Sequence, residues 1–412
     1  MKIRRKYLFY VLAFSSAIIA ALNSGVDATV SKLFVTDGWA LGFATFAVGI
    51  PVTLFLGIFL SLPLKGKSIG SRADPSFKRI RLLQREELFP QLAASLGNVL
   101  YTIGYFALFI IIEDPSVVLP FTQVVILYLV AIEAFNEKDM PTMIEFQSIL
   151  IVTFGAILGS LSLSGNLNIE SLLIVFFIIN PGWVLLTIYQ RKLKWLKINN
   201  QYNDAINIRL WNVFFSCILV TLIIFGYDWI NGTHHLTAGI SAVLTQFWWI
   251  AAISTGAFFA LIFYIRALGI GKASVVQAVR SSTIIFSIPV SLFIASLGII
   301  QPFSFDPVLL IIKIIGITIM ILGIISFALN LVKAYVFINV KPGYPIEETM
   351  KKLWSIRGVA RVTATAGTYD FIIKIRTRTL VKGYEKIIRK IEDIEAIKEY
   401  KWESVLKEWE DI

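Results

Sequence analysis

The chain has very little of the residues on which most active sites and metal centres depend. Among its 412 residues there is one cysteine, Cys217, and there are two histidines, the adjacent His234 and His235. A single cysteine excludes an intramolecular disulfide, and two neighbouring histidines without further ligands are a weak metal signal. We expect Cys217 to be a small apolar core residue and the histidines to lie in a solvated loop. No nucleophile and base pattern occurs either, so we expect no enzyme, metal or cofactor.

Charge is also scarce. Only 16% of the residues are charged and 57% are hydrophobic, with a mean hydropathy of +0.75. A soluble protein of this length needs a polar surface that this composition cannot supply. The composition therefore predicts that most of the chain lies in lipid.

The apolar residues fall into ten runs, most of them long enough to cross a bilayer. The runs are Tyr7–Val30, Ala40–Leu62, Leu88–Ile112, Val117–Phe135, Ile144–Leu163, Leu172–Tyr189, Leu210–Tyr227, Leu244–Ala267, Val275–Ile300 and Val308–Leu331. Basic residues precede the first run and follow the second, fourth, sixth and eighth, whereas the opposite loops offer only Lys32. This distribution places both termini in the cytoplasm. It also accounts for the net charge of +11 without nucleic acid.

Short motifs recur at a spacing of roughly 157 to 164 residues. The pairs are Asn23-Ser24-Gly25 with Asn180-Pro181-Gly182, Ser116-Val117-Val118 with Ser274-Val275-Val276, and Ile157-Leu158-Gly159 with Ile321-Leu322-Gly323. Two repeats of five spans, residues 5–165 and 168–332, follow from this order. Because five is an odd number, the second copy enters the membrane from the opposite side, as in many secondary transporters.

Residues 5–332 resemble the drug/metabolite transporter superfamily of the EamA type in their two five-helix halves, their Ser-Val-Val motifs and the glycines of their last helices. The glycines are Gly155, Gly159, Gly316 and Gly323. The resemblance implies transport of small metabolites such as amino acids, sugars or drugs, without naming the solute.

From residue 333 to residue 412 the pattern changes to alternating and charged. It predicts strands over Ala334–Val340, Gly358–Ala366, Asp370–Arg376 and Ile397–Val405, and helices over Ile346–Ser355 and Leu380–Ile394. Ile346, Met350, Leu353 and Trp354 share one helical face, as do Tyr384, Ile387, Ile388 and Ile391. This βαββαβ order predicts an α+β ferredoxin-like sandwich.

This segment resembles the effector-binding domain of the Lrp/AsnC, or feast/famine, regulators. The resemblance rests on Ala334–Ile338 with Lys341-Pro342-Gly343, on Ile356–Val362, and above all on Gly367–Ile375. It implies a homodimer and an amino-acid effector near Gly367, Tyr369 and Asp370. A glycine permits a tight turn with positive φ, and an aspartate accepts hydrogen bonds from an ammonium group. Alternatively, Gly367 and Asp370 only form the hairpin. No DNA-binding part precedes the segment, so we expect no nucleic-acid partner.

Polar residues inside the apolar runs are the candidates for a solute site. Ser16, Asn23 and Asp27 share a face of the first helix, and we expect paired interruptions at Asn23-Ser24-Gly25 and Asn180-Pro181-Gly182. Asp27 is a candidate proton-coupling carboxylate, or a solvated residue at the outer interface beside Lys32.

Arg280 shares a face of the ninth run with Gln277 and could attract a carboxylate or phosphate, or extend to the interface. Gln123 is a weaker cavity candidate. Tyr105 and Tyr264 could line an apolar cavity, as could Trp183, or serve only in packing. Glu133 is expected at an interface.

Taken together, these patterns predict a transporter of small organic solutes, with amino acids or related metabolites as the expected class. It works by alternating access under control of an amino-acid-sensing domain. Two alternatives remain open. One is a membrane sensor that transports nothing, and the other is a transporter whose soluble domain only dimerises.

Overall fold

The computed structural model describes residues 5–64, 66–111, 119–136, 143–160, 169–198, 200–298, 307–329, 332–356, 358–377 and 387–404. The chain forms two compact units. One comprises residues 1–140 and 147–324, and the other comprises residues 141–146 and 325–412. The first unit is helical, and the second contains a four-stranded sheet. The domain boundary predicted from the sequence falls at the start of the first strand of that sheet.

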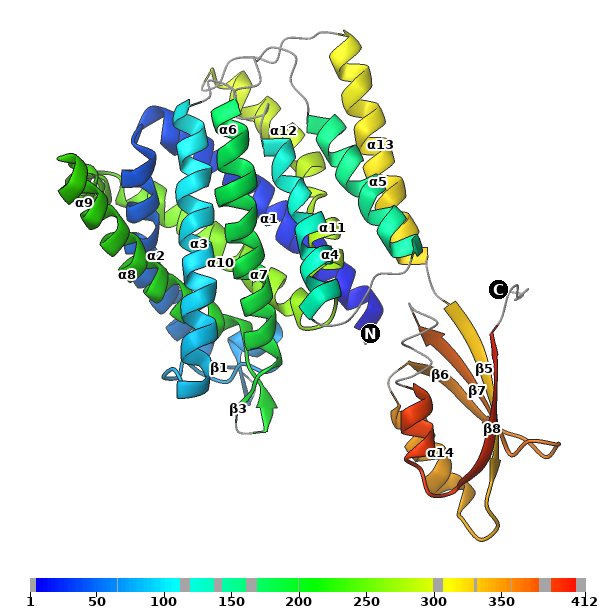
Figure 1. The fold of residues 1–412 in the computed structure, drawn as a ribbon. Coiled ribbons are helices and arrows are strands. Elements are labelled where there is room, and N and C mark those ends of the chain that lie inside the picture. Colours follow the sequence, from blue (N-terminus) through cyan, green and yellow to red (C-terminus); the bar gives the residue numbers. More distant parts are fainter. Residues whose placement is uncertain are drawn as a thin grey trace. The chain divides into compact units, whose positions relative to one another are not determined.

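Helices occur at all five apolar runs of the first predicted repeat (Figure 1). They are α1 (Arg5–Leu33), α2 (Gly38–Ser61), α3 (Arg85–Ile111), the 3-10 helix η3 (Leu119–Val124) continued by α4 (Val125–Asn136), and α5 (Met143–Ser160). The segment between α2 and α3 contains strands β1 (Pro63–Leu64) and β2 (Lys67–Ser68) and the 3-10 helix η1 (Ile69–Arg72).

The second predicted repeat is also helical at each apolar run. Its elements are α6 (Ile169–Ile174), the π-helical η4 (Val175–Ile179), α7 (Asn180–Trp195), the hairpin β3 (Lys197–Ile198) and β4 (Gln201–Tyr202), α8 (Ala205–Asn231), α9 (His235–Thr245), α10 (Phe247–Leu268), α11 (Ala273–Arg280), α12 (Thr283–Ser296) and α13 (Pro307–Leu329).

The expectation that the histidine pair lies in a solvated loop holds for His234, which is exposed and precedes α9, and is wrong for His235. His235 begins the helix, and its Nδ1 lies 2.6 Å from Oδ2 of Asp37. The carboxylate of Asp228 accepts the backbone N–H groups of His235 and Leu236 at 3.2 and 2.9 Å. These bonds satisfy donors that the first turn of a helix leaves open, which favours helix over loop.

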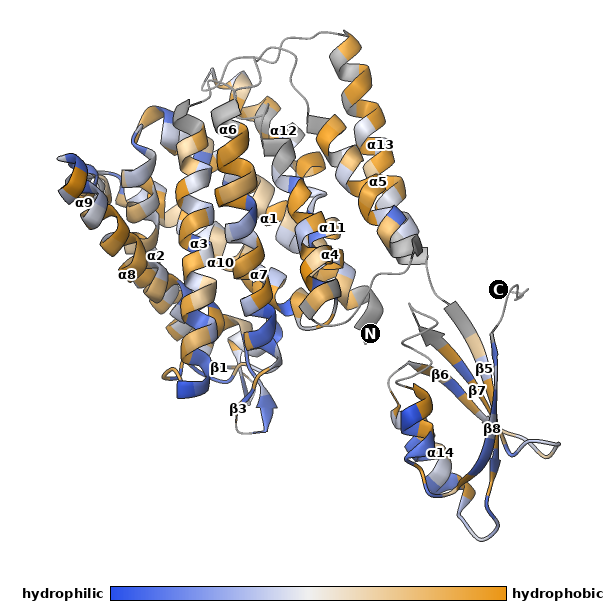
Figure 2. Ribbon diagram, viewed as in Figure 1, coloured by the Kyte–Doolittle hydropathy of each residue, from blue (hydrophilic) through white to orange (hydrophobic). Residues whose placement is uncertain are grey.

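Six helices within the described ranges are long and apolar enough to cross a membrane. They are Leu8–Leu33, Gly38–Ser61, Leu172–Trp195, Ala205–Asn231, Phe247–Leu268 and Ala273–Ser296. Hydrophobic residues dominate these helices, whereas α14 (Ile346–Ser355) and the strands of the C-terminal sheet alternate in character (Figure 2). The helices suggest a membrane protein. Ten spans and the inverted repeat stay predictions, and the motif Ser116–Val118 lies outside the described residues.

The two expected helix interruptions have different outcomes. Helix α1 runs unbroken through Asn23-Ser24-Gly25, so the interruption predicted there is wrong. The other lies where it was expected, because Pro181 follows the five-residue π-helical segment Val175–Ile179. A proline donates no backbone hydrogen bond, which favours the wider turn before it. The small residues of Asn23-Ser24-Gly25 do not by themselves break a helix.

The C-terminal sheet contains β5 (Val332–Val340), β6 (Val359–Ala364), β7 (Phe371–Thr377) and β8 (Ile397–Ser404). The strand order is β6-β7-β5-β8, and every neighbouring pair is antiparallel. Residues 387–392 are helical, while residues 380–386 of the helix predicted over Leu380–Ile394 lie outside the described residues. The four predicted strands and the helix Ile346–Ser355 are therefore present, with boundaries that agree to within two residues.

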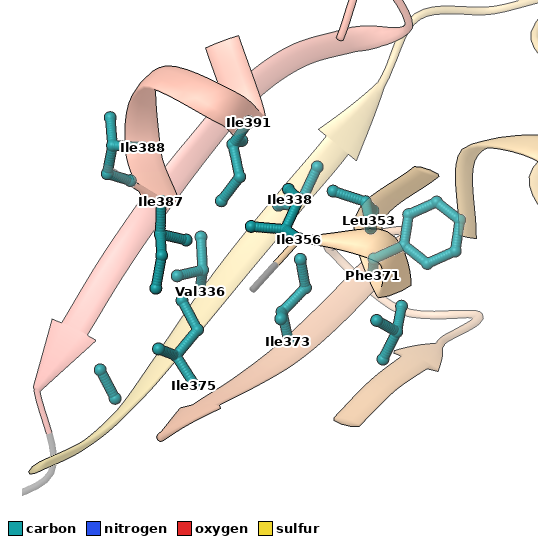
Figure 3. Close-up of a cluster of buried hydrophobic side chains, with 12 residues drawn as sticks. Val336, Ile338, Leu353, Ile356, Phe371, Ile373, Ile375, Ile387, Ile388 and Ile391 are labelled. Carbon is teal, nitrogen blue, oxygen red and sulfur yellow. The ribbon is translucent and has the colours of Figure 1, made fainter. Parts of the chain in front are cut away.

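One face of this sheet carries a hydrophobic core (Figure 3). Its buried residues are Ala334, Val336, Ile338, Leu353, Ile356, Val362, Phe371, Ile373, Ile375, Ile387, Ile388 and Ile391. Alternate residues of β5, from Ala334 to Ile338, and of β7, from Phe371 to Ile375, belong to it, as the pleat of a strand requires. Ile346 and Trp354 do not, since they are 62% and 58% exposed. Helix α14 instead buries Thr349 and Leu353, and the Thr349 hydroxyl donates to the carbonyl of Pro345.

Candidate solute and effector sites

Two glycines bring α3 and α7 into direct backbone contact. A Cβ atom added at Gly97 would lie 2.5 Å from the carbonyl oxygen of Gly182, and one added at Gly182 would lie 2.8 Å from the backbone nitrogen of Tyr101. Only residues without a side chain permit such an approach. The crossing sets Tyr101, one turn beyond Gly97, beside Trp183, the residue after Gly182.

A cluster of four aromatic side chains extends from this crossing. The ring centroids of Tyr101 and Trp183 are 4.6 Å apart, those of Tyr101 and Tyr105 are 5.9 Å apart, and those of Trp183 and Tyr264 are 5.5 Å apart. We call Tyr101, Tyr105, Trp183 and Tyr264 the aromatic cluster. It joins helices α3, α7 and α10.

Gln277 of α11 holds two of these rings in place. Its Oε1 accepts the indole N–H of Trp183 at 3.0 Å and the hydroxyl of Tyr264 at 3.2 Å. The Tyr264 hydroxyl also lies 3.0 Å from Oγ1 of Thr187. Trp183 and Tyr264 are buried, and a buried polar group without a hydrogen-bond partner destabilises the fold, so these bonds favour the observed arrangement.

Arg280 lies one turn beyond Gln277 and contacts the same two rings. Its guanidinium carbon is 4.4 Å from the ring centroid of Trp183 and 5.0 Å from that of Tyr264. Its buried Nε has no hydrogen-bond partner. Arg280 therefore does not extend to an interface, and these cation–π contacts leave its in-plane N–H groups available.

Asp27 is an acidic residue inside the apolar helix α1. It is 8% exposed, which removes the alternative of a solvated residue beside Lys32. Its oxygens lie 3.4 and 3.5 Å from the amide nitrogen of Asn23. Asn23 itself packs on Gly256 of α10, where an added Cβ would meet the Asn23 amide oxygen at 2.1 Å.

Asn180 and Gln123 are the remaining polar candidates from the sequence. Asn180 is fully buried at the start of α7. Gln123 lies in η3, where its amide nitrogen is 3.4 Å from Oγ1 of Thr122 and its buried amide oxygen has no partner. Conversely, the sequence interpretation did not single out Tyr101. The four-residue spacing of Gly97, Tyr101 and Tyr105 places them on one helix face and could have indicated it.

Glu133 is buried at the end of α4 and does not lie at an interface. It is 2% exposed, and its Oε1 lies 2.8 Å from Nη1 of Arg191 in α7. The carboxylate also accepts the backbone N–H groups of Ala273 and Ser274, which begin α11. Glu133 thus caps the helix that carries Gln277 and Arg280.

A second polar network joins the segment before α3 to the segment before α8. Asp74 Oδ2 lies 2.5 Å from Nζ of Lys194 and accepts the N–H of Ala205 at 2.8 Å. Arg81 forms a bidentate pair with Glu87, with distances of 2.6 and 2.7 Å. We call Asp74, Arg81, Glu87 and Lys194, with Asn203, which bonds to both Arg81 and Glu87, the interloop network.

Burial and neighbouring charges shift the pKa values of the ionisable groups in and beside this network. Burial favours the neutral acid at Asp74, but the Lys194 charge and the backbone donors outweigh it and hold the pKa below its ordinary value. At Arg81, burial opposes the charge, but Glu87 raises the pKa above its ordinary value. For the nearby Asp204, burial dominates and raises the pKa despite the Asn207 bonds.

The candidate effector residues have mainly structural contacts. Asp370 Oδ2 accepts the N–H of Val340 at 2.7 Å, and the Tyr369 ring lies 5.1 Å from that of Phe337. Gly367 does not have a positive φ, and an added Cβ there would meet nothing within 4 Å. Gly367 therefore does not use the positive φ that a glycine permits, and the turn Thr365–Asp370 is closed by bonds that include Thr365 N–H to the Asp370 carbonyl at 2.9 Å.

The glycine crossing gives a direct stability prediction. Gly182→Ala should lower the thermal unfolding midpoint, because the new methyl group meets backbone rather than side chain, and overpacking of this kind costs about 1–3 kcal/mol. Gly226→Ala in α8 is the matched control, since an added Cβ there meets nothing within 4 Å. That variant should match or exceed the wild type. Equal midpoints for the two variants would contradict the crossing.

Comparison with known proteins identifies one part of the chain. No curated protein matches it. A solved structure described as "Crystal structure of protein" is 14% identical and covers 77% of this chain and 96% of its own, with a TM-score of 0.48, which is too low to carry an argument. Residues 333–411 match the family model of the Lrp/AsnC ligand binding domain, so the C-terminal segment is a domain of that family, as its sequence predicted.

Proposed function

We propose that the chain is a membrane transporter of small organic solutes, mainly amino acids or related metabolites. It binds the solute without changing it chemically, at the aromatic cluster with Arg280 and Asp27. The observation that carries the proposal is a pair of ionisable side chains, Arg280 and Asp27, that have no ion-pair partner in the described part of the apolar helices. Charged groups inside membrane helices are costly, and they mark solute or ion pathways.

The C-terminal domain supports the second part of the proposal, which is regulation by an amino-acid effector. Lrp/AsnC ligand-binding domains bind small-molecule effectors, and residues 333–411 belong to this family. Only two residues separate the end of α13 at Leu329 from the start of β5 at Val332. A ligand that favours one state of the domain can therefore bias the helices through a short connection. We further propose that the domain lies in the cytoplasm and forms a homodimer, and that the two five-helix repeats work by alternating access.

The experiment that tests the proposal measures flux and binding on one panel of radiolabelled amino acids. The full chain in liposomes is assayed for counterflow, and the same protein in detergent is assayed for binding. We expect at least one compound to exchange, and a bound amino acid to change the exchange rate. Arg280→Ala should abolish exchange and leave binding to the C-terminal domain intact.

The alternatives predict different results. Binding without counterflow of any compound would favour a sensor that transports nothing and would overturn the proposal. If the wild type shows counterflow but the Arg280→Ala variant binds no amino acid, the C-terminal domain has no effector and serves only as a dimerisation module.

A further inference from the structure

One face of α7 carries a line of buried side chains with hydrogen-bonding groups. At 3.6 residues per turn, its members lie within about 60° of one another around the helix axis. We call them the α7 polar line: Trp183, Thr187, Gln190 and Lys194. The line begins beside Arg280, whose guanidinium carbon is 4.4 Å from the Trp183 ring centroid. It ends at the interloop network, where Lys194 Nζ lies 2.5 Å from Oδ2 of Asp74. It therefore connects the candidate solute site with the end of the helix.

Gln190 is the member of this line whose side chain has no partner in the part of the chain that the structure describes. Trp183 and Thr187 form hydrogen bonds within the candidate solute site, and Lys194 is paired. Gln190 is 0% exposed, yet neither its Nε2 nor its Oε1 has a hydrogen-bond partner. A buried amide without partners destabilises the fold. Stability of the described state therefore does not account for a glutamine at this position.

The two neighbouring members of the line show which face of α7 carries Gln190. Thr187, three residues before it, lies 3.0 Å from the hydroxyl of Tyr264 in α10. Lys194, four residues after it, packs on Gly269, where an added Cβ would lie 2.7 Å from the Lys194 Cγ. Gly269 directly follows α10. Because residues three and four apart are neighbours on a helix surface, Gln190 lies on the face of α7 that packs on α10.

We propose that Gln190 is a second contact site for the solute, on its route between Arg280 and the Lys194 end of α7. This inference rests on the proposed function and adds a position to the route, about 10 Å along the helix from Trp183. A primary amide both donates and accepts, so it can bond either charged group of an amino acid without carrying a charge that retains it. The pair of Lys194 with Asp74 occupies the last position of the line, so it must separate before the solute leaves past Gln190.

The first test compares transport with stability. Gln190→Met keeps the length of the side chain and removes the amide. In full-chain liposomes, counterflow of the radiolabelled amino acid that the wild type exchanges fastest should fall roughly 10-fold or more, because a hydrogen bond to a charged group is lost on the route. The thermal unfolding midpoint should equal or exceed that of the wild type, since an unpartnered buried amide is removed. The binding that Arg280→Ala removes should remain.

Gln91→Met is the matched control. Gln91 is also a buried glutamine, 1% exposed, but its Nε2 donates to the carbonyl of Ile208 at 2.8 Å. This variant should lower the midpoint, because it deletes a satisfied buried hydrogen bond, and it should leave counterflow per folded protein unchanged. The two glutamines thus have opposite expected patterns, which a general loss of packing would not produce.

The second test uses the single cysteine of the chain. In a Cys217→Ala background, Gln190→Cys should react with the membrane-permeant thiol reagent 2-aminoethyl methanethiosulfonate when the full chain is in liposomes. The same amino acid should slow this reaction several-fold, because it occupies the route. Gln91→Cys in the same background should stay unreactive, since that position is equally buried and lies outside the α7 polar line.

Three results would overturn the inference while the proposed transport stands. They are wild-type counterflow in Gln190→Met, a midpoint for that variant well below the wild type, which would show a structural role, and a Gln190→Cys reaction that the amino acid does not slow. A wild type that carries no amino acid overturns the transport proposal itself, and this inference with it.

Discussion

Replacing Glu133 with alanine should lower the thermal unfolding midpoint strongly, by the equivalent of about 3–5 kcal/mol. The side chain is buried, and its Oε1 lies 2.8 Å from Nη1 of Arg191. The variant leaves a buried guanidinium without this carboxylate, which is far costlier than losing an exposed ion pair. It also removes the acceptor for the first N–H groups of α11, those of Ala273 and Ser274, which adds about 1 kcal/mol.

Two further variants distinguish the loss of the ion pair with Arg191 from the loss of the hydrogen bonds that cap α11. Glu133→Gln keeps an acceptor for the N–H groups of α11 but loses the negative charge. Its unfolding midpoint should therefore lie between that of the Glu133→Ala variant and that of the wild type. The double variant Glu133→Ala with Arg191→Met should recover part of the loss, since no isolated charge remains. A Glu133→Ala midpoint equal to that of the wild type would show that the pair contributes nothing. Because α11 carries Gln277 and Arg280, solute counterflow should fall with the midpoint.

Local patterns predicted the elements well because they depend on neighbours in the sequence. The predicted strands alternate in polarity, and in the structure the pleat places Val336, Ile338 and Ile373 of β5 and β7 in the core. The apolar runs likewise contain helices. Errors arose where the residue type alone was taken to determine the backbone conformation or the burial of a position. Gly367 did not need a positive φ, and the apolar Trp354 lies outside the core while the polar Thr349 lies inside.

The candidate site was predicted only in part, because its contacts join distant residues. The sequence identified Asn23, Asp27, Gln277 and Arg280 as polar residues in apolar helices, without saying which would meet. The bond from Trp183 to Gln277 links residues 94 positions apart. The bond joins α7 to α11, and no periodic pattern in either helix specifies which residue of the other helix it will meet.

Replacing Asp74 with asparagine should have the second large effect, a loss of about 3–5 kcal/mol at neutral pH, because it leaves the buried Lys194 ammonium without a charge partner. Thermal midpoints measured from pH 7 downward provide the test. Glu86→Gln is the matched control, since Glu86 is an exposed carboxylate beside the buried Glu87. The control should keep the wild-type midpoint throughout.

The sign of the pH dependence follows from the pKa of Asp74, which lies below its ordinary value of 3.8 in the folded protein. A depressed pKa means that the folded state favours the carboxylate, so the stabilisation is present above pH 3.8 and is lost as the pH falls through the folded pKa. The wild type should therefore approach the Asp74→Asn midpoint only at acidic pH below 3.8, while the difference stays constant between pH 5 and 7. A difference that grew on acidification would mean that folding favours protonated Asp74, contrary to the ion pair with Lys194.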